Sequence, residues 1–414
     1  MSVVVRPIDD DELVEWVAAM LMAFHVNRSA EDEARYRRDV RGQDYSRSLA
    51  AFDERGKIVG TYFSFATQLS LPGADACVPT NAVTSVSVLP THHRRGLLRQ
   101  MLTADLAAAR QRGEAASVLI AAEYPIYGRF GFGPATEQVD YRLETEHADF
   151  VRQAPGSVEL VSPEAMRQIA PAIFDQVRRT WPGQIDRQPA RWDQRLGLRP
   201  APWREPKDVL RCAAYTGPNS QTPTGYVLYH AHGDWRDRVP SGRVEVDELM
   251  ALDGDAYLGL WRYCAEIDLV AEVTAELRRA HEPLSWLLAN PRRALHEVSH
   301  SDFLWLRALD TPRLLEARRY AAAERLVLEV DDPLGLSGGR FALEGGPDGA
   351  LCRATTHTAD VRLPMMALGA VVLGGSDLAA VATAGLVEEH TPHSLERAAR
   401  LFHWPTDPWC STFF

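Results

Sequence analysis

A basic turn that contains one glycine is the first feature of the sequence that could do chemistry. It follows a Val-rich run closed by Pro90 and precedes a segment whose apolar residues recur with helical spacing. The first amides of a helix lack partners within it, so a pyrophosphate can bind there, and glycine lets the backbone approach it closely. An ordinary strand-to-helix turn with solvated arginines is the alternative. The candidate phosphate-binding residues are His93, Arg94, Arg95, Gly96, Leu97, Leu98 and Arg99.

The second feature is the glycine- and aromatic-rich segment 126–135, which reads Ile-Tyr-Gly-Arg-Phe-Gly-Phe-Gly-Pro-Ala. A tyrosine just after a strand, such as Tyr127, is commonly a core residue.

Two histidine patterns invite a metal-site hypothesis. His296 and His300 fit His-Glu-x-x-His, which holds zinc when both histidines share one face of a helix. The β-branched Val298 between them, and the alternating run that follows, favour a strand, so we expect no metal site there. His230 and His232 have strand spacing, and we expect them to form a half-exposed pair on a strand.

The motifs His-Arg-Arg-Gly-Leu-Leu-Arg at 93–99 and Tyr-Gly-Arg-Phe-Gly-Phe-Gly-Pro at 127–134 resemble the enhanced-intracellular-survival (Eis) family of GNAT-type N-acetyltransferases. The resemblance continues through the stretch 248–262, the run Phe303–Arg307 and the aromatic C-terminus. It implies two tandem GNAT-like acetyltransferase domains followed by a sterol-carrier-protein-like α+β domain, assembled as a hexamer. Only the first domain would bind acetyl-CoA, as co-substrate.

The resemblance also implies roles for individual residues. Tyr127 matches the general acid that protonates the departing CoA thiolate, and the terminal carboxylate of Phe414 matches the general base. Backbone groups of Val86 and Val88, on the exposed edge of a splayed strand, would contact the pantetheine and the thioester carbonyl. A large acidic pocket for polycations such as aminoglycosides would be lined by Phe24, Asp32, Glu33 and Tyr36, and Glu123 and Phe413 are further candidate substrate residues.

Three of these positions carry their own alternatives. His93 stands where an arginine is common in the family, and position 413 is Phe where an acidic residue would favour amine binding. Glu123 would either bind or deprotonate the amine or remain a surface carboxylate.

An α/β scaffold has to position these residues, and the first third of the chain predicts one. Alternating strand-like and helix-like patterns, separated by Gly, Pro and Asp punctuation, run through it. We expect strands at Ser2–Arg6, Arg47–Asp53, Lys57–Ala66, Cys77–Leu89 and Ser117–Ala121, and helices from Asp9 to Phe24 and at Arg94–Arg112.

The rest of the chain predicts two further segments. In the second, the strand Arg243–Leu252 leads into the helix Ala256–Tyr263, the same order as in the first segment. Its turn, Asp253-Gly254-Asp255, is acidic and could not hold phosphates in the same way. In the third we expect strands at Leu326–Asp331, Gly339–Glu344 and Ala350–Ala354, and helices at Met365–Leu373 and Asp377–Ala384. The expected domains are 1–150, 151–309 and 310–414.

Composition narrows the class of protein. The 414 residues carry a formal charge of −11, which argues against a nucleic-acid partner and suits a cationic substrate. No apolar run reaches the ~18 residues that cross a bilayer, so we expect no membrane partner and a cytoplasmic location. The five cysteines are scattered, which favours neither a disulfide framework nor a thiolate zinc site.

The sequence therefore predicts an acetyl-CoA-dependent N-acetyltransferase that modifies a primary amine of a small molecule, without a metal. The alternative is a non-catalytic protein that binds acyl-CoA or lipid. The acceptor, the range of acyl chains, lipid binding by the C-terminal domain and hexamer formation stay open.

Overall fold

The computed structural model describes residues 3–26, 29–31, 34, 45–199 and 209–414. The chain divides into two compact units. Unit 1 comprises Met1–Thr136, Phe303–Pro408 and Phe413–Phe414, and unit 2 comprises Glu137–Asp302 and Trp409–Thr412.

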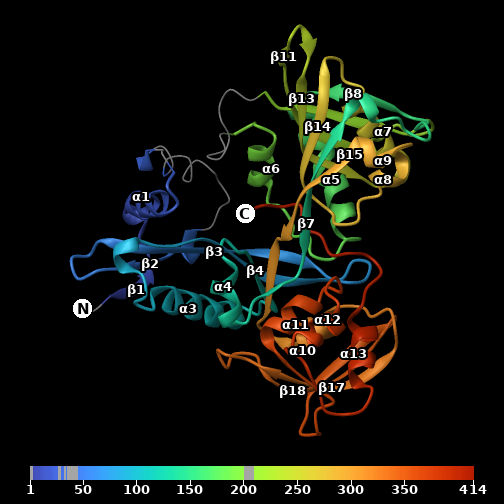
Figure 1. The fold of residues 1–414 in the computed structure, drawn as a ribbon. Coiled ribbons are helices and arrows are strands. Elements are labelled where there is room, and N and C mark those ends of the chain that lie inside the picture. The colour runs from blue at the N-terminus through green and yellow to red at the C-terminus, as the bar shows by residue number, and fades with distance from the viewer. Residues whose placement is uncertain (1–2, 27–28, 32–33, 35–44, 200–208) are drawn as a thin grey trace. The chain divides into compact units, whose positions relative to one another are not determined.

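The first sheet belongs to unit 1. Among the described residues seven strands form it, in the order β1-β2-β3-β4-β5-β16-β6, with β4 parallel to β5. Helices α1 (Leu13–Ala23) and α3 (Leu97–Gln111) cover opposite faces of this sheet (Figure 1). The strands are β1 (Val4–Pro7), β2 (Leu49–Phe52), β3 (Ile58–Ser70), β4 (Cys77–Val88), β5 (Ala116–Ile120), β6 (Gly133–Pro134) and β16 (Leu304–Ala308).

The second sheet, in unit 2, repeats this order. Its described strands run β8-β9-β10-β13-β14-β7-β15, and β13 is parallel to β14 as β4 is to β5. They are β7 (Glu137–Glu144), β8 (Ser157–Val161), β9 (Arg211–Thr216), β10 (Gly225–His232), β13 (Gly242–Ala251), β14 (Val270–Arg278) and β15 (Leu295–Asp302). The helices of this unit are α5 (Pro163–Arg178), α6 (Pro189–Arg195), α7 (Gly254–Ala265), α8 (Leu284–Leu287) and α9 (Pro291–Ala294), and β11 (Trp235–Arg236) pairs with β12 (Val239–Pro240).

Each of these two seven-stranded sheets contains one strand from the stretch of chain that forms the other sheet. β7 follows the first-sheet strands in the chain yet pairs with β14 and β15, whereas β16 follows the second sheet yet pairs with β5 and β6. The two exchanged strands hold equivalent places in the two sheets. The chain thus passes from the first sheet to the second between β6 and β7, and it returns to the first sheet between β15 and β16.

The C-terminal part of unit 1 is a five-stranded sheet of described residues, in the order β19-β18-β17-β20-β21, with four helices packed around it. Its strands are β17 (Glu324–Asp331), β18 (Gly339–Gly346), β19 (Gly349–Ala354), β20 (Val361–Pro364) and β21 (Glu388–Glu389). Its helices are α10 (Thr311–Ala317), α11 (Met365–Val371), α12 (Leu378–Thr383) and α13 (Ser394–Phe402).

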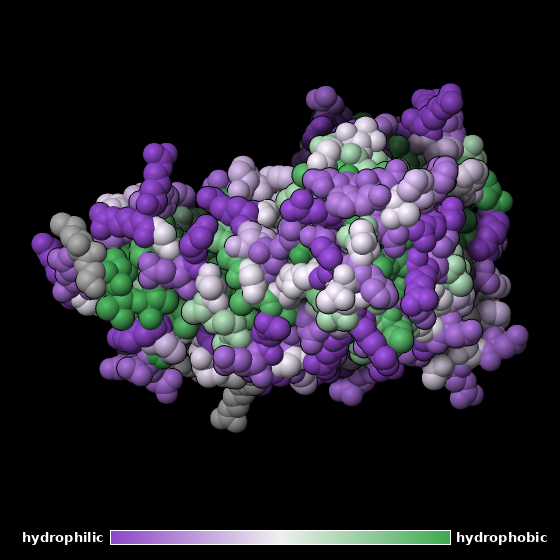
Figure 2. Space-filling view, turned by 90° about the horizontal axis from the view of Figure 1, so that it is seen from below, coloured by the Kyte–Doolittle hydropathy of each residue, from purple (hydrophilic) through white to green (hydrophobic). Residues whose placement is uncertain are grey.

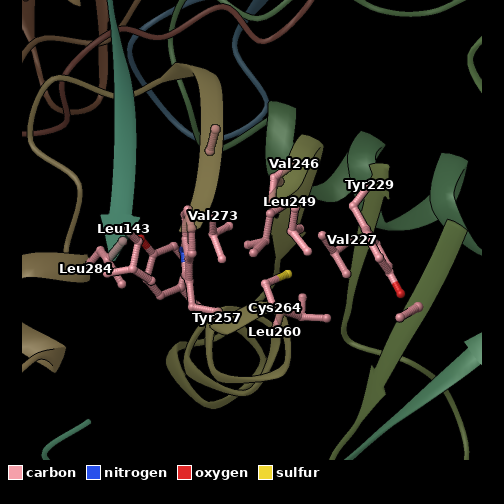
Figure 3. Close-up of a cluster of buried hydrophobic side chains, with 14 of the residues drawn as sticks. Leu143, Val227, Tyr229, Val246, Leu249, Tyr257, Leu260, Cys264, Val273 and Leu284 are labelled. Atoms are coloured by element: carbon pink, nitrogen blue, oxygen red, sulfur yellow. The ribbon is translucent and has the colours of Figure 1, made fainter. Parts of the chain in front are cut away.

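Each sheet buries its apolar positions against helices, as period-2 and period-3.6 patterns require. In unit 2, Figure 3 shows Tyr257, Leu260 and Cys264 of α7 beneath Val246 and Val273 of the sheet, and all five belong to one buried cluster. On the face seen in Figure 2, apolar residues form separate patches among polar ones. The expected α/β and α+β class is confirmed.

Candidate active site

Strand β4 opens the first sheet at its carboxyl end. Its parallel pairing with β5 covers Thr80–Val83 against Ala116–Leu119, while β4 itself continues to Val88. Ser85 lies in the left-handed region at φ +53°, and the register against β3 shifts there, which marks a bulge. The last residues of β4 are thus paired with β3 on one side and have passed the end of the β5 pairing on the other.

The backbone of Val86 and Val88 faces this open side. The N–H of Leu89 donates to the Val59 carbonyl at 2.8 Å, and strand groups alternate in direction, so Val88 and Val86 point away from β3. The His93 Nε2 lies 2.8 Å from the Val88 carbonyl oxygen. His93 therefore folds back onto the strand end, and its proposed contact with phosphate stays a prediction.

The start of α3 has free amides. Gly96 is its N-cap at φ +76°, and no side chain caps the helix, so the amides of Leu97, Leu98 and Arg99 have no acceptor within the helix. A Cβ at Gly96 would meet nothing within 4 Å. Glycine is required here for its left-handed backbone rather than for space.

The arginines predicted to meet phosphate are neighbours of these amides in the chain. Arg94, Arg95 and Arg99 are exposed. The Arg95 guanidinium donates to the Thr91 carbonyl at 3.4 Å, and that of Arg99 lies 5.9 Å from the Phe130 ring centre. Positive charge, helix dipole and unpaired amides coincide here, which is the chemistry of an anion-binding site.

The equivalent helix of unit 2 lacks this arrangement. Asp253 caps α7 by accepting from the amides of Asp255 at 3.0 Å and Ala256 at 2.8 Å. Its carboxylate takes the place that a phosphate would occupy and repels one. The acidic turn seen in the sequence thus has a structural role as a helix cap.

Tyr127 ends the short helix α4 (Tyr124–Tyr127) and is 7 % exposed. It packs among side chains of β4, β5 and α3, with its ring 6.3 Å from that of Phe132. Burial, and then the nearby Glu123 carboxylate, raise the pKa of Tyr127 to about 12. The phenol is therefore a hydrogen-bond donor at any physiological pH.

Helix α11 explains the glycines that follow Tyr127. A Cβ at Gly133 would overlap the Met366 carbonyl oxygen, and one at Gly131 would overlap the Arg307 guanidinium. Gly369 makes the reciprocal contact, because its Cβ would overlap the Leu306 carbonyl oxygen of β16. The glycines thus allow backbone-to-backbone packing of the C-terminal part on the segment that carries Tyr127.

A buried ion pair that sequence reasoning missed reinforces this contact. Arg307 and Asp332 have side chains 0 % and 1 % exposed, with Nη2 2.7 and 2.8 Å from the two carboxylate oxygens. Arg307 also donates to the Phe130 carbonyl. Burial lowers the pKa of Arg307, and the Asp332 carboxylate opposes that shift. No local sequence motif predicts this ion pair, because Arg307 and Asp332 lie in separate elements.

A second buried network missed by the sequence fixes α3 to the sheet. Asp105 of α3 accepts from the Tyr62 hydroxyl at 2.8 Å, the Ser64 hydroxyl at 2.8 Å and the Asn81 amide at 2.7 Å. These donors come from β3 and β4. The network therefore sets the position of α3, and with it the free amides, against the strand end.

The C-terminal residue contacts the other face of the same sheet. The Phe414 ring meets that of Phe65 edge to face at 5.6 Å. On β3, Tyr62 and Ser64 face α3, so Phe65 faces the α1 side. Tyr127 belongs to the cluster under α3. The two proposed catalytic groups thus lie on opposite faces of a sheet that opens between β4 and β5.

The proposed substrate residues are placed unevenly. Phe24 follows α1 and is 47 % exposed, and Phe413 is 62 % exposed with its ring 6.4 Å from that of Phe303. Glu123 is exposed beside Tyr127. Asp32, Glu33 and Tyr36 lie outside the described residues.

The histidine patterns lie on strands. His296 and His300 are in β15, with Nε2 atoms 3.0 Å from a Glu144 oxygen and 2.9 Å from a Glu137 oxygen. Within the described ranges, no three His, Cys, Asp or Glu side chains gather as a metal site would need. In those same ranges every helix is too short or too polar to cross a bilayer.

Comparison with known proteins gives the family. Residues 4–135 and 183–308 each match an acetyltransferase (GNAT) domain, and residues 311–411 match a sterol carrier protein domain. The chain is 37 % identical to an uncharacterized N-acetyltransferase of Streptomyces avermitilis, over 99 % of this chain and 98 % of that one. It is 32 % identical to N-acetyltransferase Eis of Mycobacterium tuberculosis, over 84 % of this chain and 83 % of that one.

A solved structure agrees with these sequences. Eis1 from Mycobacterium abscessus superposes with a TM-score of 0.83 at 29 % identity, covering both chains completely. Two GNAT domains followed by a sterol-carrier-like domain are thus confirmed, as the two motifs predicted. The chain belongs to the Eis family of GNAT-type N-acetyltransferases.

Proposed function

We propose that the chain moves the acetyl group of acetyl-CoA to a primary amine at the open end of β4 in unit 1. GNAT domains generally use acetyl-CoA. The observation that carries the assignment is the uncapped start of α3 beside the exposed arginines, in contrast to the capped α7. In this proposal residues 1–150 are the catalytic domain, 151–309 a degenerate GNAT-like domain, and 310–414 the sterol-carrier-like domain whose terminus docks in the active site.

Phosphate binding falls to the helix start. The amides of residues 97–99 hold the pyrophosphate of acetyl-CoA, and Arg94, Arg95 and Arg99 add charge-assisted hydrogen bonds. The outward backbone groups of Val86 and Val88 bind the pantetheine and polarise the thioester carbonyl.

The chemical step is direct attack. The amine nitrogen forms a bond to the thioester carbonyl carbon, the carbon–sulfur bond breaks, and the CoA sulfur leaves as a thiolate. The Phe414 carboxylate takes the proton from the amine, and the Tyr127 phenol donates its hydrogen bond and proton to the sulfur. Support comes from the protonated, buried state of Tyr127 and from the contact of Phe414 with Phe65.

The acceptor class is a cationic small molecule with several primary amines, such as an aminoglycoside or a polyamine. The formal charge of −11 favours cations, and the exposed aromatic rings of Phe24 and Phe413 offer apolar and cation–π contacts. Glu123, beside Tyr127, supplies a carboxylate for the ammonium group. Asp32, Glu33 and Tyr36 complete the proposed lining, and we infer a cytoplasmic hexamer without a metal.

Thiol release from acetyl-CoA tests the proposal. The protein is offered aminoglycosides, polyamines and lysine peptides in turn, with acetyl-CoA binding measured separately by calorimetry. We expect turnover with at least one polyamine-type acceptor. Absence of acetyl-CoA binding would contradict the assignment, whereas binding without turnover on any of these amines would contradict the acceptor class.

One appended residue tests the base. Adding alanine after Phe414 moves the free carboxylate one residue away and leaves the rest of the chain unchanged. We expect kcat to fall by about 100-fold, as removal of a general base typically does, with acetyl-CoA binding retained. An extended chain with unchanged kcat would refute the role of the Phe414 carboxylate.

A further inference from the structure

A buried ion pair in unit 2 contacts the segment 409–412. Arg187, between α5 and α6, and Glu248 of β13 have side chains that are both 1 % exposed. Their atoms meet at 2.9 Å (Nη1 to Oε1) and 2.6 Å (Nη2 to Oε2). Tyr226 donates to the same carboxylate at 2.6 Å, and Arg195 adds a contact at 3.0 Å.

The pair is kept ionised. Burial alone would raise the pKa of Glu248, but Arg187 and Arg195 lower it to about 2. Burial alone would lower the pKa of Arg187, but the Glu248 carboxylate outweighs the effect of burial, so the pKa of Arg187 is raised. The Arg187 guanidinium has five N–H groups, so it can also donate to acceptors other than Glu248.

Arg187 also donates to the segment 409–412, which is called the tail below. Arg187 Nε donates to the Thr412 hydroxyl at 2.9 Å, and Nη2 donates to the Ser411 carbonyl and hydroxyl at 3.3 Å each. The Ser411 hydroxyl donates in turn to the Gln184 side chain at 3.0 Å. The Trp409 indole donates to the Leu277 carbonyl at 2.7 Å. The segment 409–412 is buried throughout.

Phe413 and Phe414 come next in the chain and, fully extended, span at most about 7 Å, so the position of Thr412 limits where the Phe414 carboxylate can go. Chain termini usually fray unless they are tied down. The buried pair ties this one down two residues before the carboxylate that is proposed as the base.

We propose that Arg187 and Glu248 are positioning residues for acetyl transfer: they fix Ser411 and Thr412 and thereby limit the reach of the Phe414 carboxylate to about 7 Å from Thr412. The inference rests on the proposed function, in which that carboxylate is the base. Neither side chain takes part in the chemistry, and their effect reaches the reaction through the tail.

Two full-length variants remove hydrogen bonds between the tail and Arg187, one by changing the tail residues and the other by changing the ion pair. Ser411→Ala with Thr412→Val removes the tail hydroxyls without changing their size greatly. Arg187→Met with Glu248→Gln removes both charges of the fully buried pair together, and the introduced amide oxygen can still accept from Tyr226 and Arg195. The matched control is Arg167→Met with Asp193→Asn, a pair in the same unit with its Nε 2.7 Å from a carboxylate oxygen.

Tail release is measured independently of catalysis. Carboxypeptidase A removes exposed C-terminal aromatic residues, and the mass of the intact protein reports the loss of Phe414. We expect release about 10-fold faster in both tail variants than in the control, since each has lost hydrogen bonds to a charged group. We expect kcat to fall about 10- to 100-fold, with the KM for acetyl-CoA within about twofold, and added formate to restore part of kcat.

Each contrary outcome points to a different error. Unchanged release would overturn the anchoring role. Faster release with unchanged kcat would overturn the positioning role if a chain lacking Phe414 is inactive, because the carboxylate would then matter without being held by this pair. If the chain lacking Phe414 were fully active, the proposed base would fall, and the positioning role with it.

Discussion

Changing Gly133 to Ala tests how closely α11 supports the segment that carries Tyr127. The new Cβ would overlap the Met366 carbonyl oxygen and lie 2.8 Å from the Ala370 amide nitrogen. Both are backbone atoms, so no side chain can rotate away, and the cost should reach the upper end of the overpacking range, about 3 kcal/mol. For a unit of this size that corresponds to a fall in Tm of roughly 6–12 °C.

Thermal unfolding measured by calorimetry gives the first result, and kcat the second. Gly233→Ala is the control, because a Cβ there meets nothing within 4 Å, and its change should stay within about 0.5 kcal/mol. Since α11 packs on the segment that follows Tyr127, we also expect a lower kcat in Gly133→Ala at temperatures where it is fully folded. A Gly133→Ala protein with the Tm and kcat of the control would refute the contact between α11 and this segment.

Two further predictions concern charge. Arg99→Gln should raise the Kd for acetyl-CoA about 10- to 100-fold, the equivalent of one charged hydrogen bond, and leave kcat unchanged; isothermal titration checks it, and an unaltered Kd would remove Arg99 from the phosphate site. The folded pKa of Glu248 is about 2, below its ordinary value of 4.5, so its contribution to stability is complete above pH 4.5 and lost as the pH falls towards 2. Unfolding by urea between pH 5 and 2 should therefore show a loss on the order of 3 kcal/mol that is smaller in Glu248→Gln, and identical pH profiles would contradict it.

The sequence predicted β4 and α3 well, because their signals are local. A Val-rich run, a proline and a glycine placed the end of β4 and the start of α3 within a few residues. The helix begins at Leu97 rather than at Arg94, because Arg94 and Gly96 both adopt left-handed backbone angles. A run of arginines does not reveal that in advance.

Contacts between segments far apart in the chain could not be predicted from the sequence. The exchange of β7 and β16 depends on pairing between strands far apart in the chain, and hydrophobic periodicity does not predict which strands pair. The Arg307–Asp332 pair was hidden for the same reason. The turn of His93 back onto the Val88 carbonyl is a rotamer choice that residue spacing does not encode.

The central claim is that Tyr127 delivers a proton to the leaving thiolate at the open end of β4. Its most direct test is kcat of Tyr127→Phe with an accepted amine, beside the Kd for acetyl-CoA. The account predicts a fall in kcat of about 100-fold or more with an unchanged Kd, since only the phenolic hydroxyl is removed from a packed ring. A variant that turns over at the wild-type rate would contradict it.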